Sequence, residues 1–550
     1  MTGGLMQLVG KGAQDTLLTG NPSFTHFRSV YKRHTEFAME HFRLYFKTTN
    51  LNLPQSGSLT LRAKVERYAQ LLYDCYLNIS LPDIYSPVTQ SGVGYEFQWV
   101  KNLGYNMINY VAIVINGQEI ARHTGEWMKL YSYLKFSENK KAMINEMTGN
   151  TPDLYDPANA FGRTQYPHSI SSSTQVAAPS IAGKTLTIPL HFWFCESIGS
   201  AIPLIALQHS DIEFVVELKN IYQLFTVKDV RSSVNGSANP NFRNRTAYSN
   251  IATNLSMSMF LSPPTSTLSP TNSNLNTWKL NPFMECNYIF VSDAEMAHIA
   301  STDHSFILTQ IDMREAFGQY GPSNDLDLIM RNLCTRVIWV CQRSDRLKIN
   351  DYDNYSNWDS SSPPGSGWFS TSGYQLPSGV TSRDILVESS IVIDGKERFG
   401  IKQAEFFRNI QNYRHHEGRT TDLFGIYSYS FALEHDKPQP CGHINGSQFN
   451  KTILQNTYIQ PPLASYAGVT VAPTQICVLK STANSPHPVQ VDPTLKDKSG
   501  KLVYNPSDVV TVVQLAGSNS LAYTFTVRAY VESYNFLRVM GGIANVVFSS

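Results

Sequence analysis

The chain has 550 residues, a formal net charge of +1 and charged side chains at only 16% of its positions, whereas an average soluble domain has about 25%. The near-neutral charge excludes the broad cationic surface with which proteins contact nucleic acid phosphates, so we expect no direct nucleic acid partner. The low charged fraction predicts that much of the surface is covered by protein partners.

The N-terminal segment 1–27 mixes glycine, an Asn-Pro pair and apolar residues without a sustained helical or strand period. We therefore expect an arm outside any hydrophobic core, whose apolar residues need another surface to cover them. The segment lacks a cationic stretch followed by a long apolar core, so the sequence predicts neither secretion by that route nor a membrane span. The apolar residues of this arm are Leu5, Met6, Leu8, Val9, Leu17 and Leu18.

Strand periodicity dominates the rest of the chain. Apolar and polar residues alternate at 59–66, 74–81, 212–218 and 523–531, as they do in half-buried β-strands. The length allows two β-sandwiches of about 270 residues each. The 12% aromatic content, with glycine and proline spread along the chain as turn residues, favours that division.

One short motif occurs twice. The segment 113–119 reads IVINGQE, and 391–397 reads IVIDGKE. The two copies contain Asn116-Gly117 and Asp394-Gly395, dipeptides whose access to positive φ favours a two-residue type I′ hairpin turn. The repeat predicts that one domain is built twice.

A helical pattern follows the first copy of the motif. Apolar residues recur at the spacing of one helix face after a candidate N-cap at Thr124. We expect a short amphipathic helix that covers the end of a sandwich and not a ligand site. The residues of the apolar face are Trp127, Leu130, Tyr131 and Leu134.

Three long polar stretches, 227–276, 354–382 and 461–520, interrupt the strand signals. Loops of this length are uncommon in compact domains unless they are functional or disordered. A short helix at 292–298 is expected to join the two halves, and a new strand signal begins at Ser305.

Motifs that would indicate catalysis or metal binding are weak. The segment 4–11 misses the spacing of a phosphate-binding loop by one residue, and Gly12 stands where serine or threonine would hold magnesium. Adjacent residues such as His415, His416 and Glu417 rarely point toward one metal ion, and no GxSxG elbow or distinctive acid–base pair occurs. We therefore expect no enzyme, no catalytic or metal-binding residues and no cofactor. The seven cysteines form no CxxC pair, which favours reduced residues of a cytosolic protein.

Several ordered segments carry a more specific signal. The opening MTGGLMQLV is followed within the first 38 residues by GAQD, LTGNP and FRSVYKRHTEFA. Further along the chain come AIPLIALQ at 201–208, YSYSFAL at 427–433 and YNFLRVMGG at 534–542. Together these segments closely resemble the major capsid proteins of nucleocytoplasmic large DNA viruses over roughly the whole chain. The main departure from the family pattern is the length of the loops 227–276 and 461–520.

The resemblance implies an all-β fold of two consecutive eight-stranded antiparallel jelly-roll sandwiches with long loops and a few short helices. The N-terminal arm would be 1–27, at the base of the capsomer. The first jelly roll would be 28–294, the linker 295–304 and the second jelly roll 305–550.

The resemblance further implies a structural protein of the virion. It would homotrimerise into pseudo-hexagonal capsomers that tile the icosahedral shell of a large double-stranded DNA virus. The expected partners are its own copies in the trimer and in neighbouring capsomers, minor capsid and penton proteins, and indirectly an internal virion membrane. Assembly is expected in the host cytoplasm, with the arm on the inner face and the 354–382 loop and at least part of the other long loops on the outer face.

Because jelly rolls also occur in lectins, a carbohydrate-binding or host-attachment protein is the alternative function. Its support is the set of aromatic residues in the expected outer loop. The oligomeric state separates the two functions, since a capsomer requires a stable trimer and a lectin does not. The outer-loop candidates are Trp358, Gly365, Trp368 and Tyr374.

Overall fold

This computed structural model describes residues 3–48, 51–86 except 55, 95–169 except 164, 178–229, 278–357 except 323, 348 and 349, 384–418, 425–459 except 436 and 438, and 523–548, together with short segments between 233 and 263 and between 474 and 514. The described residues form mainly antiparallel β-sheets, with few helices.

The first half of the chain folds into a sandwich of two main sheets. One sheet has the order β1-β14-β3-β7, with β8 paired to β3, and the other has the order β2-β9-β5-β6. A smaller sheet, β13-β10-β4, extends this half. The strands are β1 (Phe37–Tyr45), β2 (Leu59–Lys64), β3 (Leu71–Ser80), β4 (Tyr95–Trp99), β5 (Ile108–Ile115), β6 (Gln118–Thr124), β7 (Thr185–Pro189), β8 (Ile202–Pro203), β9 (Ile212–Leu218), β10 (Phe225–Asp229), β11 (Ser233–Val234), β12 (Ser237–Ala238), β13 (Arg245–Thr246) and β14 (Phe283–Val291).

The second half repeats this design. One main sheet has the order β15-β26-β17-β21, with β22 on β17 and β27 on β26, and the other has the order β16-β23-β18-β19, with β20 on β18. The strands are β15 (His304–Gln319), β16 (Asn324–Leu328), β17 (Leu333–Arg343), β18 (Leu386–Ile393), β19 (Lys396–Glu397), β20 (Lys402–Gln403), β21 (Ile426–Ser430), β22 (Ile444–Asn445), β23 (Thr452–Tyr458), β24 (Thr474–Leu479), β25 (Val509–Gln514), β26 (Phe525–Met540) and β27 (Ile543–Val546).

The two sandwiches share one strand order. In each half, the first main strand pairs with the last, and the last pairs with the third. In the other main sheet, β9 lies between β2 and the hairpin strand β5, just as β23 lies between β16 and the hairpin strand β18. The repeat seen in seven residues of sequence therefore extends over a whole domain. Because extra short strands lengthen these sheets, the predicted count of eight strands per sandwich stays a prediction.

The helices lie in the connections. In the first half, α3 (Leu103–Met107) precedes β5, while α4 (Gly125–Lys135), α5 (Glu138–Thr148) and α6 (Pro152–Tyr155) follow β6, and α7 (Trp193–Glu196) follows β7. In the second half, α9 (Ser344–Leu347) follows β17, and a π-helix η7 (Phe406–Ile410) runs into α10 (Gln411–His415). The short helix predicted between the halves is α8 (Asp293–Ser301).

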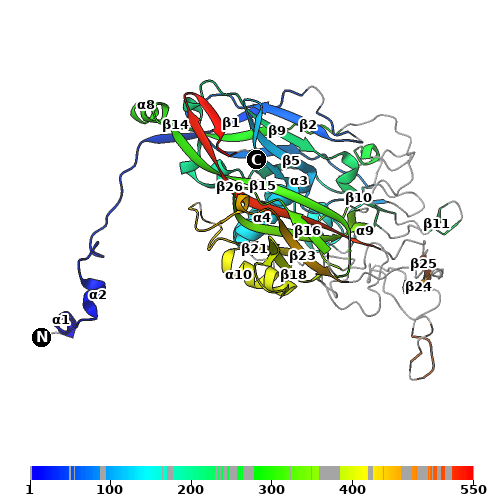
Figure 1. Cartoon of the computed structure of the whole chain (residues 1–550). Helices are drawn as coiled ribbons and strands as arrows, with labels where there is room; N and C mark the ends of the chain where they lie inside the picture. The colour runs from blue at the N-terminus through cyan, green and yellow to red at the C-terminus, as the bar shows by residue number, and fades with distance from the viewer. Residues whose placement is uncertain are drawn as a thin grey trace.

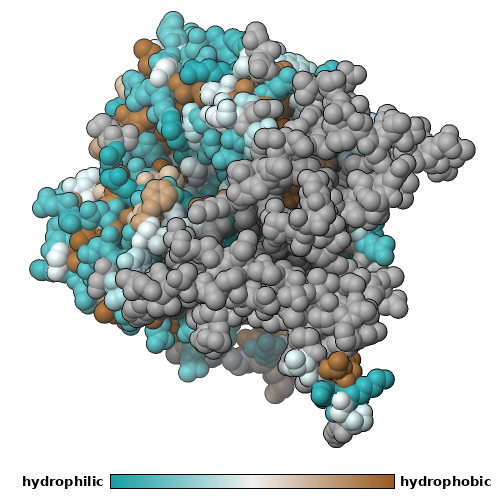
Figure 2. All heavy atoms as spheres, turned by 90° about the vertical axis from the view of Figure 1, so that its right-hand side faces the viewer, coloured by the Kyte–Doolittle hydropathy of each residue, from teal (hydrophilic) through white to brown (hydrophobic). Residues whose placement is uncertain are grey.

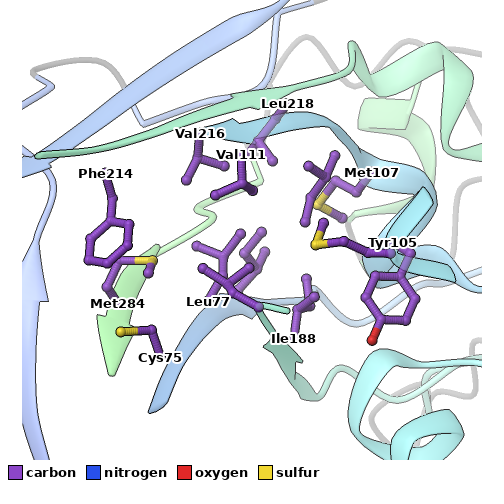
Figure 3. Packing of buried hydrophobic residues seen from close by; sticks show 14 of the residues in the cluster. Cys75, Leu77, Tyr105, Met107, Val111, Ile188, Phe214, Val216, Leu218 and Met284 are labelled. Carbon is purple, nitrogen blue, oxygen red and sulfur yellow. The ribbon is translucent and has the colours of Figure 1, made fainter. Parts of the chain in front are cut away.

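The core of the first sandwich lies between its two main sheets. In Figure 3, Leu77 of β3 and Met284 of β14 point toward Val111 of β5 and Phe214 and Val216 of β9. These side chains are buried because alternate residues of each strand face the opposite sheet. The same apolar cluster includes Ile338, Val340 and Tyr530 of the second sandwich, so the two halves are joined by packed apolar side chains.

The repeated hairpins share their turn geometry and a further contact. Asn116 and Gly117 have φ of 52° and 79°, and Asp394 and Gly395 have φ of 46° and 78°, the positive values that a type I′ turn requires. Asn116 Oδ1 accepts a hydrogen bond from the Asp211 amide at 3.0 Å. Asp394 Oδ1 accepts one from the Lys451 amide at 2.9 Å. Each turn therefore anchors the start of the neighbouring strand, β9 or β23.

The alternating segments of the sequence correspond to observed strands, since 59–66, 74–81 and 212–218 contain β2, most of β3 and β9. The last strand is longer than predicted, because β26 continues to Met540. Six described cysteines are free, and Cys75, Cys286, Cys334 and Cys341 among them are buried. In the part of the chain that the structure describes, no helix is long and apolar enough to span a membrane.

The described residues before β1 form an arm that leaves the sandwiches. It contains two short helices that the sequence did not predict, α1 (Gly3–Val9) and α2 (Asp15–Thr19), and its side chains are exposed throughout. In Figure 1 the arm extends from the end of the molecule near α8, and the N-terminus lies far from every sheet. Figure 2 shows the face of the molecule on the side opposite the arm. On the described part of this face, hydrophobic residues are scattered among hydrophilic ones.

Candidate functional site: the junction of the sandwiches and the exposed arm

The helix predicted after the first hairpin is α4, and it forms the centre of the junction. Its N-cap is Thr124, whose Oγ1 accepts a hydrogen bond from the Trp127 amide at 3.1 Å, as predicted. Leu130 and Leu134 join the core of the first sandwich. The helix does not cover a free end of the sandwich, because its other side contacts strands of the second half.

Glu126, in the first turn of α4, is bound by three side chains of the second half. Its carboxylate accepts hydrogen bonds from Arg528 Nη2 at 2.8 Å, Tyr355 OH at 2.8 Å and Tyr530 OH at 2.5 Å. Burial alone raises the pKa of this carboxyl, but the charge and hydrogen bonds of Arg528, with smaller contributions from Lys129 and Tyr530, outweigh burial and lower the pKa to about 2. Glu126 is therefore ionised and fixes the first turn of α4 on β26.

A second carboxylate, Glu532, binds groups from both halves. Arg336 of β17 donates to it through Nε at 2.6 Å and through Nη2 at 2.8 Å, which is the bidentate geometry of a strong ion pair. The indole Nε1 of Trp127 on α4 donates to Glu532 Oε1 at 2.8 Å. Trp127 is thus held by a hydrogen bond at its polar edge while its ring is buried.

A second ion pair crosses the junction one turn further along α4. Lys129 Nζ contacts Asp353, and both side chains are buried. Asp353 also accepts hydrogen bonds from Asn102 Nδ2 at 2.7 Å and Asn106 Nδ2 at 3.4 Å. Buried ion pairs of this kind require defined geometry and saturated hydrogen bonding. The ion pairs Glu126–Arg528 and Lys129–Asp353, together with the hydrogen bond from Trp127 to Glu532, therefore favour one orientation of the second sandwich on the first.

A cavity of about 280 Å³ lies beside α4, between the two halves. Two histidines, His191 and His435, line this cavity. Burial is the main cause that lowers the pKa of His191 to about 3 and the pKa of His435 well below its usual value. The carboxylates at the wall, Glu196 and Glu532, are bonded to Tyr131 and Arg336 respectively. The arrangement stabilises the junction, and the described residues contain no group of three or more histidine, cysteine or acidic side chains placed to hold a metal ion.

The closing segment of the chain also contacts the first half. The turn between β26 and β27 contains Gly541 and Gly542, both with positive φ. The Gly542 carbonyl accepts hydrogen bonds from the His209 amide at 3.1 Å and from Ser210 Oγ at 3.2 Å, in the loop before β9. A Cβ at Gly542 would lie 2.7 Å from the His209 ring, so a glycine is needed for this approach.

The predicted site residues fall into three groups. The hairpin residues are in turns, as described above. The arm residues are exposed, each with half or more of its side chain accessible, and no described segment covers them. The outer-loop candidates lie outside the described residues. They are Trp358, Gly365, Trp368 and Tyr374.

The sequence did not predict that charged residues would join the two sandwiches. Glu126 and Arg528 are separated by 402 positions, and Trp127 and Glu532 by 405. A single sequence contains no local signal for such pairs. The available local hint was that the charged Glu126 and Lys129 stand next in sequence to residues of the apolar face of this amphipathic helix.

Known proteins are similar to this chain in sequence over both of its halves. A model described as the major capsid protein N-terminus matches residues 25–256, and a model described as the large eukaryotic DNA virus major capsid protein matches residues 295–482. The major capsid protein of Phaeocystis pouchetii virus is 27% identical over 526 residues, covering 83% of this chain and 92% of the relative. That of Paramecium bursaria Chlorella virus 1 is 23% identical over 572 residues and covers 100% of both chains.

Solved structures share the fold. A chain of the PBCV-1 virus capsid has a TM-score of 0.60 at 17% identity, with 96% of this chain and 100% of that chain covered. The Faustovirus major capsid protein has a TM-score of 0.58 at 12% identity, with 98% and 96% covered. The strand order, the repeated sandwich and these matches over both halves agree, and the chain belongs to the major capsid proteins of large eukaryotic DNA viruses, structural components of the virion capsid.

Proposed function

We propose that this chain forms a homotrimeric capsomer of pseudo-hexagonal outline, many copies of which tile an icosahedral shell. The observation that supports it is the junction. Two sandwiches of one strand order are held by buried ion pairs in a fixed orientation, so three chains would present six similar sandwiches around one axis. A closed three-fold ring with six similar outer sides fits a hexagonal lattice.

The proposal also assigns which parts of the capsomer face the inside and the outside of the shell. We place the arm 1–27 at the inner base, where its exposed apolar residues would be covered by minor capsid proteins near an internal membrane, and the 354–382 loop on the outer surface. The first jelly roll would comprise 28–294, the linker 295–304 and the second jelly roll 305–550. Neighbouring capsomers and penton proteins are further partners, and assembly takes place in the host cytoplasm.

Native mass spectrometry of the purified chain tests the capsomer. We expect a species with the mass of three subunits at micromolar concentration and moderate salt, because the interface per subunit should well exceed the ~800 Å² per partner of a standard protein interface. A spectrum dominated by monomer would refute the proposal.

A further inference from the structure

The junction inside the chain joins two defined elements. The helical segment that follows the hairpin of the first sandwich, α4, contacts the outer face of the sheet β15-β26-β17-β21 of the second sandwich. The outer face means the side turned away from that sandwich's own core. Arg528, Tyr530 and Glu532 of β26 project from it, whereas Val527, Ala529 and Val531 belong to the core of the second sandwich.

The equivalent helical segment of the second sandwich has a side that no described segment covers. It is helical from Ala404 to His415 and includes η7 and α10. Its inner side is covered, since Phe407 packs on Trp339 with ring centroids 5.1 Å apart. On its other side Ile410 is 47% and Tyr413 is 90% exposed. This exposed side, with Glu405, is here called the α10 face.

The equivalent sheet of the first sandwich, β1-β14-β3-β7, also has an outer face that no described segment covers along its edge strand β1, the counterpart of β15. Phe42 and Leu44 point toward the core. The alternate residues point outward, and Phe37 is 51% and Tyr45 is 68% exposed. Arg43 lies in the same row, 4.7 Å above the ring of Phe283 on β14. The outward residues Phe37, Met39, His41, Arg43 and Tyr45 are here called the β1 face.

We propose that the α10 face of one copy docks on the β1 face of a second copy, so that the contact between subunits repeats the α4 junction within the chain. The inference deepens the proposed trimer and rests on it. Going around the ring in one direction, the helical segment of each sandwich would then contact the outer sheet face of the following sandwich. Such head-to-tail contacts close into a ring when the rotation permits, and three copies give six similar contacts.

The charges of the two faces support this occupant. Glu126 is the second residue of α4 and binds Arg528 on the receiving sheet. Glu405 is the second residue of the helical run that starts at Ala404, and it is exposed. The β1 face presents the exposed Arg43 among its apolar residues. Glu405 thus matches Glu126 in its position on the helical segment, and Arg43 offers it a guanidinium on β1, the edge strand beside the β26 counterpart β14.

Substitution of the apolar residues tests the docking. The double variant Ile410→Asp/Tyr413→Asp should lose the trimer in native mass spectrometry, and so should Phe37→Asp/Tyr45→Asp on the opposing face. The matched control is Met143→Asp on α5, which is 65% exposed and lies on neither face. It should keep the trimer. All five substituted positions are exposed, and unchanged circular dichroism and melting of each monomer would show that the fold is intact.

Charge exchange tests the pairing of the two faces. Glu405→Arg and Arg43→Glu should each weaken the trimer at least tenfold in dissociation constant, because each places like charges together at the contact. The combined variant should recover most of the loss. A combined variant that is as weak as the sum of the single changes would overturn the pairing of Glu405 with Arg43.

A cross-link separates failure of this inference from failure of the trimer itself. With the photoreactive p-benzoylphenylalanine at position 413, illuminated trimers should yield peptides joined to 37–45 or 283–285 of another copy. Trimers whose cross-links map elsewhere, or that survive both double aspartate variants, would overturn the docking and leave the capsomer standing. A wild-type chain that is monomeric would overturn both.

Discussion

Two glutamates of the first hairpin region show how environment decides what a residue contributes. Glu119 bonds Arg122 at 2.6 Å, with 40% and 48% of the two side chains exposed. Glu126 bonds Arg528 with only 17% and 11% exposed. Water screens the first pair, whereas the second must satisfy its charges within the protein. The second pair therefore contributes to the attachment of the two sandwiches, whereas the first does not.

We predict that Glu126→Ala lowers the free energy of unfolding by about 3 kcal/mol, because it leaves the Arg528 guanidinium buried without its counter-charge. The matched control Glu119→Ala removes an exposed pair and should cost less than about 1 kcal/mol. Denaturant unfolding followed by tryptophan fluorescence measures both. Equal losses in the two variants would contradict a special role for Glu126.

Acid should weaken the same region in two steps. The pKa of His123 is lowered by burial from 6.5 to about 3, so the unfolded chain binds the proton first, and stability falls as the pH drops from 6.5 to 3. The pKa of Glu126 is lowered from 4.5 to about 2, and its contribution, complete above 4.5, is lost between 4.5 and 2. Unfolding free energies measured from pH 7 to pH 3 should decrease throughout.

The histidine part of this prediction has its own variant. His123→Phe should make the pH dependence between 6.5 and 4.5 less steep, since one of the titrating groups is gone, while the buried His191, His416 and His435 keep their contributions. Phe192→Leu changes the ring that stacks on His123 at 4.7 Å and should lower stability without altering the pH slope. An unchanged slope in His123→Phe would show that burial of this histidine does not set the acid response.

At the level of elements, the hairpins are the part that sequence predicted best. Alternation and the Asn-Gly or Asp-Gly turn lie within about ten consecutive residues, so one sequence is enough to identify them. Helix α4 was also predicted, with its cap at Thr124, because its signal is local. Its position between the sandwiches was not, since that depends on Arg528 and Glu532, about 400 residues away.

Replacement of the turn glycines tests the hairpins. Gly117→Val and Gly395→Val should each lower the unfolding free energy by about 1–3 kcal/mol, because a β-branched residue is strained at φ near 79° and 78°. A Cβ at either position meets no atom within 4 Å, so the loss would come from the backbone and not from a clash. Gly400→Val, also with open space and without positive φ, is the control. Equal melting of all three would contradict the assignment.

At the scale of the whole molecule, the arm and the sandwiches differ in what they leave exposed. The sandwiches bury their apolar residues between sheets, whereas the arm exposes Leu5, Leu8, Leu17 and Leu18 with no described segment to cover them. Exposed apolar groups in such number mark a contact with another component. The sequence predicted this from the missing periodicity, and it could not predict the two short helices because neither has a core to face.

The proposed polarity of the capsomer can be tested with two changes to the chain. Deletion of residues 2–20 should leave a soluble trimer, because the arm contributes nothing to either sandwich core, and should weaken attachment to the inner shell. A short hydrophilic tag near Gly365, which lies outside the described residues, should leave trimer and particle intact. Antibody binding to whole virions and the yield of complete shells measure the two effects.

The two changes check each other, since both leave the sandwiches untouched and differ only in the side of the shell that they alter. If antibodies reach the tag on whole virions and deletion of the arm gives defective shells, the arm lies on the inner side of the shell and the loop on the outer side. Complete shells assembled from the truncated chain would mean that the arm's apolar residues serve no inner contact. A tag that antibodies reach only after particles are opened would place the loop on the inner side, and the direction of the whole capsomer would be reversed.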